Sequence, residues 1–195
     1  MNAPARSTSA FRIRVACVED LPAIAAIGKL IENLHSECAP DSFASTPDFD
    51  AFNANWRERI AGPDRRGWVA EVTGPDGAPR IVGIATARLG SRRDARQTAP
   101  SIYAYIDSIG VYGTHRRKGI GAALLLQVED WATRNGAAHI RLDVAEFNAE
   151  ALRLYEHAGF ATRSRSMDKP LQRPFVPIHD EYNERHPRKD SRDQA

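Results

Sequence analysis

The sequence has few cysteines and little net charge. Only Cys17 and Cys38 occur among its 195 residues, too few for a disulfide framework and too far apart in the chain for a typical metal site. Lysine and arginine total 27 against 25 aspartate and glutamate residues, so the formal net charge is only +2. Proteins that wrap nucleic acid usually carry a large basic excess. We therefore expect two reduced thiols, no bound metal and no nucleic-acid partner.

Long apolar runs are also lacking. No uninterrupted stretch is long enough to span a bilayer, and residues 1–10 (MNAPARSTSA) lack the apolar region of a signal peptide. Hydrophobic residues make up 42% of the chain and charged residues 27%, a composition typical of globular domains. We expect a cytoplasmic protein without a membrane partner. Its predicted parts are a flexible leader at 1–10, one domain at 11–171 and a polar tail at 172–195.

Apolar spacing divides the domain into strands and helices. Alternating or short apolar runs bounded by turn formers predict strands over 11–18, 68–72, 81–89, 101–111, 140–144 and 160–171. Apolar residues at helical spacing predict helices around 24–34 and 49–60, a third from 120 to a stop at Asn135-Gly136, and a short one from about 149 to 158. Asp20 is predicted to cap the first helix. The predicted loops are 36–46 and 90–100, and the arginine-rich stretch 88–96 is expected to form a solvated hairpin tip.

The order of these elements predicts the fold class. Strands joined by short connections favour an antiparallel meander in the first half of the domain. The strand-loop-helix-strand unit at 101–144 is a crossover, which makes its two strands parallel neighbours. We therefore expect an α/β fold in which a mixed, mostly antiparallel sheet carries helices on both faces.

One loop combines glycine with basic residues at the start of a helix. Gly119 and Gly121 follow a predicted strand and open the predicted helix. Glycine lets the backbone approach a ligand closely, and the positive end of a helix attracts phosphate oxygens. Arg116, Arg117 and Lys118 add full positive charges. The segment therefore predicts a pyrophosphate-binding turn.

Two other phosphate-binding loops fit this segment poorly. A Walker loop reads GxxxxGK[ST], but here the basic residues precede the glycines and no serine or threonine follows. A dinucleotide-binding fingerprint requires a third glycine where this chain has Leu124, and it follows an early strand. An enzyme that binds ATP or NADH through this loop is therefore a weaker alternative.

The loop is part of a longer pattern. The sequence R-R-K-G-I-G at 116–121 follows Ile109-Gly110-Val111, and NAEALRLYEHAGF follows at 148–160. In this order, the segments resemble the GNAT superfamily of acetyl-CoA-dependent N-acetyltransferases, which has a Q/R-x-x-G-x-G/A loop and a later N-x-x-A-x-x-L-Y-x-x-x-G-F segment. The resemblance covers about 101–171. It implies a GNAT-type sheet whose central parallel fourth and fifth strands splay to hold acetyl-CoA.

The resemblance also implies which residues bind the cofactor. The glycine loop would wrap the pyrophosphate of CoA, and the main-chain groups of Ile109 and Val111 would pair with the pantetheine arm. Asn148 would cap the helix that follows it and also touch the cofactor. The whole set implied for acetyl-CoA is Ile109, Gly110, Val111, Arg116, Arg117, Lys118, Gly119, Ile120, Gly121, Ala122, Asn148 and Tyr155.

Catalysis would need an acid and a base. Tyr155 aligns with the superfamily's tyrosine that protonates the departing thiolate, although its spacing alone is that of a core aromatic. The acceptor amine must lose a proton before attack. Asp107 is the first candidate base, because strand alternation places it on one face with Val111, and Glu146 is the second; a structural role is the alternative for Asp107. The histidines expected to take no part are His35, His115 and His139.

The sequence thus predicts an enzyme that moves an acetyl group from acetyl-CoA to a primary amine by direct attack. The acceptor is expected to be a small amine, and neither cysteine lies in a nucleophile motif. One alternative is a non-catalytic acyl-CoA-binding sensor or interaction module. Another is a protein-acetylating member of the same superfamily. A homodimer is a further expectation from the resemblance.

Overall fold

The computed structural model describes residues 11–41, 49–92, 101–167 and 169. The chain divides into one unit at Met1–Ala161 and another at Thr162–Ala195. All described helices and strands lie in the first unit. The described residues of the second unit form neither a helix nor a strand.

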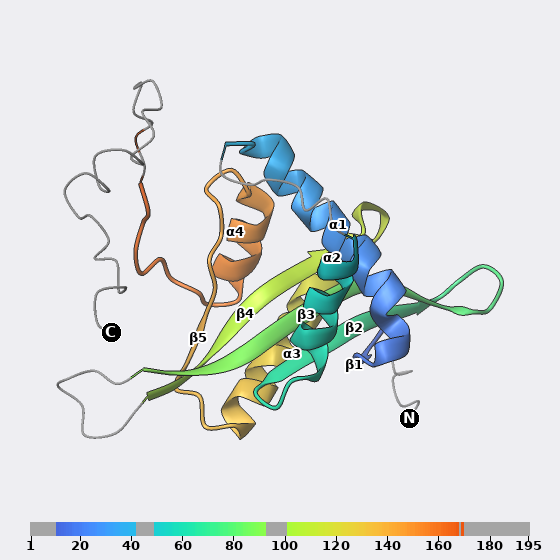
Figure 1. Ribbon diagram of the computed structural model, residues 1–195, viewed down its shortest axis with the longest axis horizontal. Helices are drawn as coiled ribbons and strands as arrows, with labels where there is room; N and C mark the ends of the chain where they lie inside the picture. Colours follow the sequence, from blue (N-terminus) through green and yellow to red (C-terminus); the bar gives the residue numbers. More distant parts are fainter. Residues whose placement is uncertain (1–10, 42–48, 93–100, 168, 170–195) are drawn as a thin grey trace, which may run out of the picture. The chain divides into compact units, whose positions relative to one another are not determined.

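The first unit is built on a five-stranded sheet with the order β1-β2-β3-β4-β5 (Figure 1). The first four strands pair antiparallel and follow one another in the sequence, whereas β4 and β5 are parallel. The predicted meander and the predicted parallel pair are therefore confirmed. The strands are β1 (Arg12–Val15), β2 (Arg65–Thr73), β3 (Pro79–Arg92), β4 (Ser101–Val111) and β5 (His139–Arg141).

Helices cover both faces of the sheet, as predicted. They are α1 (Leu21–Cys38), α2 (Phe49–Ala61), α3 (Ile120–Arg134) and α4 (Ala149–His157), with one-turn 3-10 helices at Val18–Asp20 and Gly113–His115. One core cluster joins α1 and α2 to the sheet, and a second joins α3 and α4 to the opposite face (Figure 1). No helix in the described ranges has the length and apolar character needed to cross a membrane.

Strand alternation distributes β2 side chains between the two clusters. Trp68 and Ala70 are buried with α3 and α4, while Val69, between them, is buried with α1 and α2. The ring of Trp68 also meets that of Trp131 on α3 edge to face, with centroids 5.7 Å apart. Since successive strand residues point to opposite faces, one apolar run supplies both halves of the core.

Glycine allows α1 to lie directly against the sheet. At Gly110 on β4, a Cβ atom would come within 2.7 Å of Cδ1 of Ile31 on α1. At Gly28 on α1, a Cβ would come within 2.2 Å of the Trp56 ring on α2. Real Cβ atoms do not approach so closely, so any larger residue would push α1 outward. The position of α1 over β4 therefore depends on these two glycines.

Helix α1 and the strands β2 and β3 extend further than predicted. Helix α1 continues to Cys38, where a loop was expected from residue 36. Strand β3 continues to Arg92 and pairs there with Ser101, so the start of the expected loop 90–100 is strand. Cross-strand hydrogen bonds stabilise an extended backbone whatever its apolar period. The remaining residues of the two predicted loops lie partly outside the described ranges.

Three predictions about where elements begin or end are wrong. Strand β1 stops at Val15 because a 3-10 turn follows, and β5 has three residues rather than the expected five. The Asp20 carboxylate accepts hydrogen bonds from Arg14 and from the Cys17 N–H at 2.9 Å, and it makes no capping bond to α1. The Asp20 carboxylate, which was predicted to accept from the first turn of α1, instead accepts from Arg14 and the Cys17 N–H.

The predicted final strand is absent from the described part of 160–171. Residues 160–167 and 169 have no strand pairing. A strand needs a neighbour to satisfy its backbone groups, and the edge strand β5 offers only three residues. The stretch Arg163 to Ser166 is polar throughout and supplies no apolar face for a sheet.

Candidate active site

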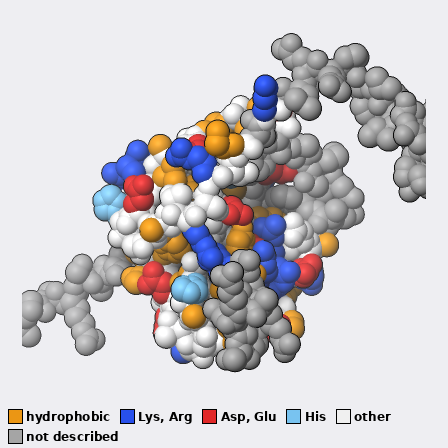
Figure 2. Space-filling model, turned by 90° about the vertical axis from the view of Figure 1, so that its left-hand side faces the viewer, with side chains coloured by type: hydrophobic (Ala, Val, Ile, Leu, Met, Phe, Trp, Pro, Cys, Tyr) orange, Lys and Arg blue, Asp and Glu red, His pale blue; other side chains and the backbone are white. Residues whose placement is uncertain are grey.

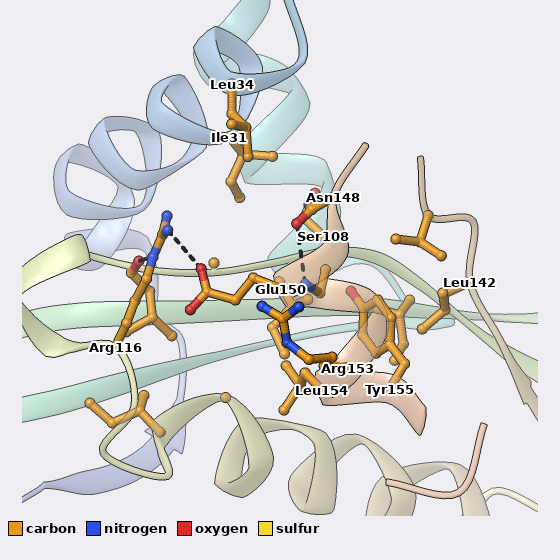
Figure 3. Close-up of a pocket in the computed structure, with 18 of the residues that line it drawn as sticks. Ile31, Leu34, Ser108, Arg116, Leu142, Asn148, Glu150, Arg153, Leu154 and Tyr155 are labelled. Carbon is orange, nitrogen blue, oxygen red and sulfur yellow. Dashed lines mark hydrogen bonds and ion pairs between the residues drawn. The ribbon is translucent and has the colours of Figure 1, made fainter. Parts of the chain in front are cut away.

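A cavity of about 500 Å³ opens beside β4. Its lining includes α1 residues between Ile27 and His35 from one face of the sheet, and α4 residues up to His157 from the other. Figure 3 shows Ile31 and Leu34 on one side and Tyr155 on the opposite side. Since both faces line a single space, the cavity passes through the sheet. In the space-filling view, Lys or Arg side chains adjoin apolar side chains in the middle of the face that is turned toward the viewer (Figure 2).

The opening arises because β4 is much longer than β5. Tyr103–Tyr105 pair with His139–Arg141, and β5 then ends. Just beyond this ladder, the Tyr105 hydroxyl donates a hydrogen bond of 2.5 Å to the Asp143 carboxylate. From Ile106 onward, β4 has no strand partner on its β5 side among the described residues. The two strands therefore separate at Tyr105 and leave a gap.

The backbone groups of Ile109 and Val111 face this gap. The N–H of Tyr112 donates to the Val82 carbonyl of β3 at 2.9 Å, so the backbone N–H of Tyr112 faces β3. Alternation along an antiparallel ladder then turns the N–H and C=O groups of Val111 and Ile109 the other way. Both residues line the cavity. They form an open strand edge to which an extended ligand can hydrogen-bond.

The loop before α3 has the geometry of an anion site. Arg117 (φ 60°) and Gly119 (φ 81°) both have left-handed backbone conformations, and α3 begins at Ile120. The first intrahelical bond runs from Ala123 N–H to Gly119. The N–H groups of the first turn thus lack helical partners, and the helix dipole adds positive potential there. Arg117 is an unusual non-glycine residue for this conformation, which is common at ligand-binding turns.

The two glycines of the loop have different tasks. At Gly119, a Cβ atom would meet nothing within 4 Å, so this glycine serves the left-handed turn. At Gly121, a Cβ would lie 3.1 Å from Cδ2 of Leu154 on α4. Gly121 therefore permits α3 and α4 to approach each other. Both glycines line the cavity.

The three basic residues of the loop point to different partners. Arg116 donates from Nε to the Val111 carbonyl at 3.2 Å and from Nη1 to Glu150 at 3.0 Å (Figure 3). Arg117 is exposed and lines the cavity. Lys118 donates to the Thr114 carbonyl at 3.0 Å and is not part of the lining. The structure thus brings Arg116 and Arg117, but not Lys118, to the cavity wall.

Tyr155 reaches the cavity from α4. Its side chain is 8% exposed, and its ring packs against Phe160 with centroids 5.7 Å apart. Burial raises the pKa of Tyr155 to about 12, because the phenolate is poorly solvated there. The hydroxyl therefore keeps its proton at neutral pH and can donate it. At the start of the same helix, the Asn148 side chain accepts from the Ala151 N–H at 3.2 Å, which confirms the predicted cap.

Asp107 lies in the cavity wall but is held by two arginines. It is the extra residue of a β-bulge, since Thr86 pairs with Ser108 and Ala87 with Ile106. The carboxylate is 7% exposed and forms ion pairs with Arg88 and, at 3.7 Å, with Arg65. Cations from β2 and β3 thus neutralise the acid that the sequence nominated first as the base.

An arginine cluster surrounds that carboxylate. Arg88 belongs to β3 and also stacks over Tyr105 at 4.3 Å, so it is not part of a solvated hairpin tip as predicted. Arg59 on α2 donates to Ser108 at 2.8 Å. Burial and then the charges of Arg65 and Arg88 lower the pKa of Arg59 below its usual range. Residues 93–96 of the predicted tip lie outside the described residues.

Three further titratable residues complete the comparison with the sequence. Glu146 is exposed and does not line the cavity. His115 lines the cavity, and its Nδ1 lies 2.9 Å from the Thr114 hydroxyl. His35 also lines the cavity, which sequence reasoning missed. The available signal was its position in phase with Ile24, Ile27 and Ile31 on α1, but the predicted helix stopped one residue short of it. No three His, Cys, Asp or Glu residues within the described ranges gather as a metal site requires.

Two curated acetyltransferases illustrate the chain's relatives. Streptothricin acetyltransferase of Streptomyces lavendulae is 43% identical over 56 residues, which are 29% of this chain and 30% of that protein. Aminoglycoside N(6')-acetyltransferase type 1 of Serratia marcescens is 31% identical over 113 residues, which are 57% of this chain and 73% of the relative. The match to the first relative thus spans less than a third of that protein.

Solved structures share the fold. A mutant of the BH1408 protein from Bacillus halodurans superposes with a TM-score of 0.72 at 22% identity, covering 82% of this chain and 99% of that one. The aminoglycoside acetyltransferase AAC(6')-Iy, in complex with the bisubstrate analogue CoA-S-monomethyl-acetylneamine, gives a TM-score of 0.62 at 18% identity, covering 83% and 98%. The expected GNAT-type fold class is therefore confirmed.

The family assignment joins these observations. The model of the acetyltransferase (GNAT) family matches residues 29–160, a range that begins on α1 and ends after α4. It contains the separated β4–β5 pair, the glycine loop and Tyr155. The resemblance inferred from the loop and the later helix is confirmed. The chain belongs to the acetyltransferase (GNAT) family.

Proposed function

We propose that the protein is an N-acetyltransferase that moves an acetyl group from acetyl-CoA to a primary amine in a ternary complex. One observation carries the proposal: a single cavity contains the open edge of β4, the glycine loop at the start of α3 and the Tyr155 hydroxyl. These are a strand edge for an extended ligand, an anion site and a proton donor. The family match supports the same chemistry.

The proposed cofactor position follows from these three features. The pyrophosphate lies on the free N–H groups at the start of α3, with Arg116 and Arg117 beside it. The pantetheine arm runs along β4 and pairs with Ile109 and Val111. The remaining contacts in this proposal come from Gly110, Lys118, Gly119, Ile120, Gly121, Ala122, Asn148 and Tyr155. Arg116 now bonds to the Val111 carbonyl, so it must release this acceptor when the arm binds.

The proposed chemistry is direct transfer. The acceptor nitrogen attacks the thioester carbonyl, and the Val111 N–H, which faces the gap, stabilises the oxyanion. Tyr155 then protonates the CoA thiolate. Asp107 and Glu146 are the carboxylates nominated as base. Because Asp107 is neutralised by Arg65 and Arg88, and Glu146 lies outside the cavity lining, we assign Asp107 the role of holding the bulge in β4.

We propose a small amine as the acceptor. The names of the two relatives refer to streptothricin and to an aminoglycoside, and such molecules carry several amino groups. The acceptor would enter beside α1, where the cavity is lined by Leu30, Ile31, Leu34 and His35. Acetylation of a protein lysine is the alternative within the same chemistry, and a lysine peptide tests it.

Calorimetry with acetyl-CoA and thiol release with amines test the proposal. Kanamycin, streptothricin, spermidine, lysine and a lysine-containing peptide form the amine panel. We expect acetyl-CoA to bind and at least one amine to release CoA. A ligand at a hundredfold its Kd adds about 2.7 kcal/mol of stability, which raises Tm by roughly 5–10 °C in a domain of this size.

Two variants separate the possible outcomes. Arg117→Glu, at the cavity wall, should weaken acetyl-CoA binding, whereas Arg57→Glu, on an exposed part of α2, should not. Binding of acetyl-CoA without turnover of any amine would favour a non-catalytic acyl-CoA sensor. A Tm shift with ATP or NADH and none with acetyl-CoA would refute the proposed function.

A further inference from the structure

A histidine with no role in the chemistry above lies over the gap between β4 and β5. His35 is one helical turn beyond Ile31, the residue that packs on Gly110 of β4. The His35 ring meets Phe147, after β5, edge to face with centroids 5.6 Å apart. Helix α1 thus extends from β4 to the segment that follows β5. His35 lies between these two contacts and lines the cavity.

The tautomer of His35 is fixed by its own helix. Nδ1 lies 2.7 Å from the Ile31 carbonyl oxygen. A carbonyl can only accept a hydrogen bond, so Nδ1 carries the proton. In the neutral ring, Nε2 then holds the lone pair and can accept a proton. The Phe147 contact restrains the ring plane, so both the tautomer and the orientation are set before a substrate arrives.

We propose that His35 is the general base of the transfer, an assignment that rests on the proposed function. Nε2 takes one proton from the acceptor's ammonium group, which frees the nitrogen lone pair. The nitrogen forms a bond to the acetyl carbon, and the bond from that carbon to sulfur breaks. Tyr155 gives its proton to the thiolate and recovers one from the nitrogen. The products are the amide, CoA thiol and one proton on His35, which solvent removes.

The competing bases are less suitable. Asp107 forms ion pairs with two guanidinium groups, which neutralise its charge, and Glu146 does not line the cavity. The charged groups on the elements around His35 are Lys29, Glu32 and Glu37 on α1, Asp143 and Glu146 between β5 and α4, and Glu150, Arg153 and Glu156 on α4; Lys29 pairs with Glu32 at 2.7 Å.

The pH dependence of His35→Gln tests the assignment. The readout is kcat/KM from pH 6 to 10, with the amine of the panel that the wild type acetylates fastest. We expect a loss of about a hundredfold at pH 7, within the usual range for a general base. The variant's rate should rise about tenfold per pH unit, because the free amine must now form in solution. His35→Ala should recover part of its activity with added imidazole.

The control is His139→Gln, since His139 is exposed on β5 and does not line the cavity. Its rate and pH profile should match the wild type. The His35 variants should bind acetyl-CoA with unchanged Kd. A wild-type pH profile in His35→Gln would overturn the assignment, as would a loss of acetyl-CoA binding equal to the loss of rate. If the wild type itself acetylates no amine, the proposed function fails, and the base assignment fails with it.

Discussion

Arg116 and Glu150 form an ion pair that joins the glycine loop to α4, with Nη1 and Oε2 3.0 Å apart. Both side chains are nearly half exposed, at 47% and 42%. An ion pair so open to solvent contributes little to stability, about 0–1 kcal/mol. Its consequence is local: in the proposed complex, the carboxylate competes with the pyrophosphate for the same guanidinium.

Removing that carboxylate should therefore tighten cofactor binding. We expect Glu150→Gln to lower the Kd for acetyl-CoA about three- to tenfold, because the variant loses a negative charge beside the phosphates and frees Arg116. The difference should shrink at 0.5 M salt, where exposed charges are screened. Calorimetry at two salt concentrations measures it. Weaker binding in the variant would mean that Glu150 instead orients Arg116 for the phosphate.

Gly119→Ala should weaken the proposed acetyl-CoA binding as well as the fold. Gly119 and Gly77 have almost equal φ angles, 81° and 77°, and a Cβ at either would meet nothing within 4 Å. Alanine at either position should therefore lower the free energy of unfolding by a similar amount, about 1 kcal/mol. Only Gly119 belongs to the cavity lining. Urea denaturation should show matching losses, while acetyl-CoA binding should weaken in Gly119→Ala alone.

Tyr155→Phe should slow the chemical step. Without the phenol, the thiolate leaves unprotonated or takes a proton from water, so kcat should fall about 10- to 100-fold. The KM for acetyl-CoA should change little, since the ring is retained. Steady-state kinetics of CoA release measure both. Tyr103→Phe, on the paired part of β4, is the matched control, and an equal drop in kcat there would refute a special role for Tyr155.

The same tyrosine should make the fold sensitive to alkali. Its pKa is about 12 in the folded protein, against about 10 for a solvated tyrosine. A raised folded pKa gives stability that is complete below pH 10 and is lost as pH rises toward 12, because the unfolded state ionises first. The loss in this window should be about 2–3 kcal/mol. Urea denaturation at pH 9 and 11.5 measures it, and Tyr155→Phe should reduce the difference between the two.

Asp107→Asn should destabilise the sheet. The variant leaves Arg88 and Arg65 beside a neutral amide, and we expect a loss of about 1–3 kcal/mol in the free energy of unfolding. Asp76→Asn is the control, because its pair with Arg80 is exposed on both sides and its loss should leave the free energy of unfolding nearly unchanged. Unchanged stability, together with a loss of rate and of the acid limb of the pH profile, would restore Asp107 as the base.

Much of the fold was predictable because it depends on short-range patterns. The alternation of β2 and the helical spacing of α3 each arise within a few turns or pairs of residues. Two of the errors fell where the outcome depends on a neighbour distant in sequence. Strand β3 continues to Arg92 because Ser101 pairs with it, and the described part of the expected final strand has no strand partner. Periodicity within a segment carries no information about either neighbour.

The conformation of the loop before α3 was predictable for a similar reason. The positive φ of Gly119, the helix start at Ile120 and the basic residues between 116 and 118 are encoded in adjacent positions. The sequence by itself therefore determined the family and the backbone geometry of this loop. Only the tertiary structure decided which side chains meet at the gap. Asp107 forms ion pairs with arginines from β2 and β3, and His35 on α1 contacts Phe147 after β5. These residues are far apart in the sequence, and only the pairing of strands and the packing of α1 on the sheet bring them together.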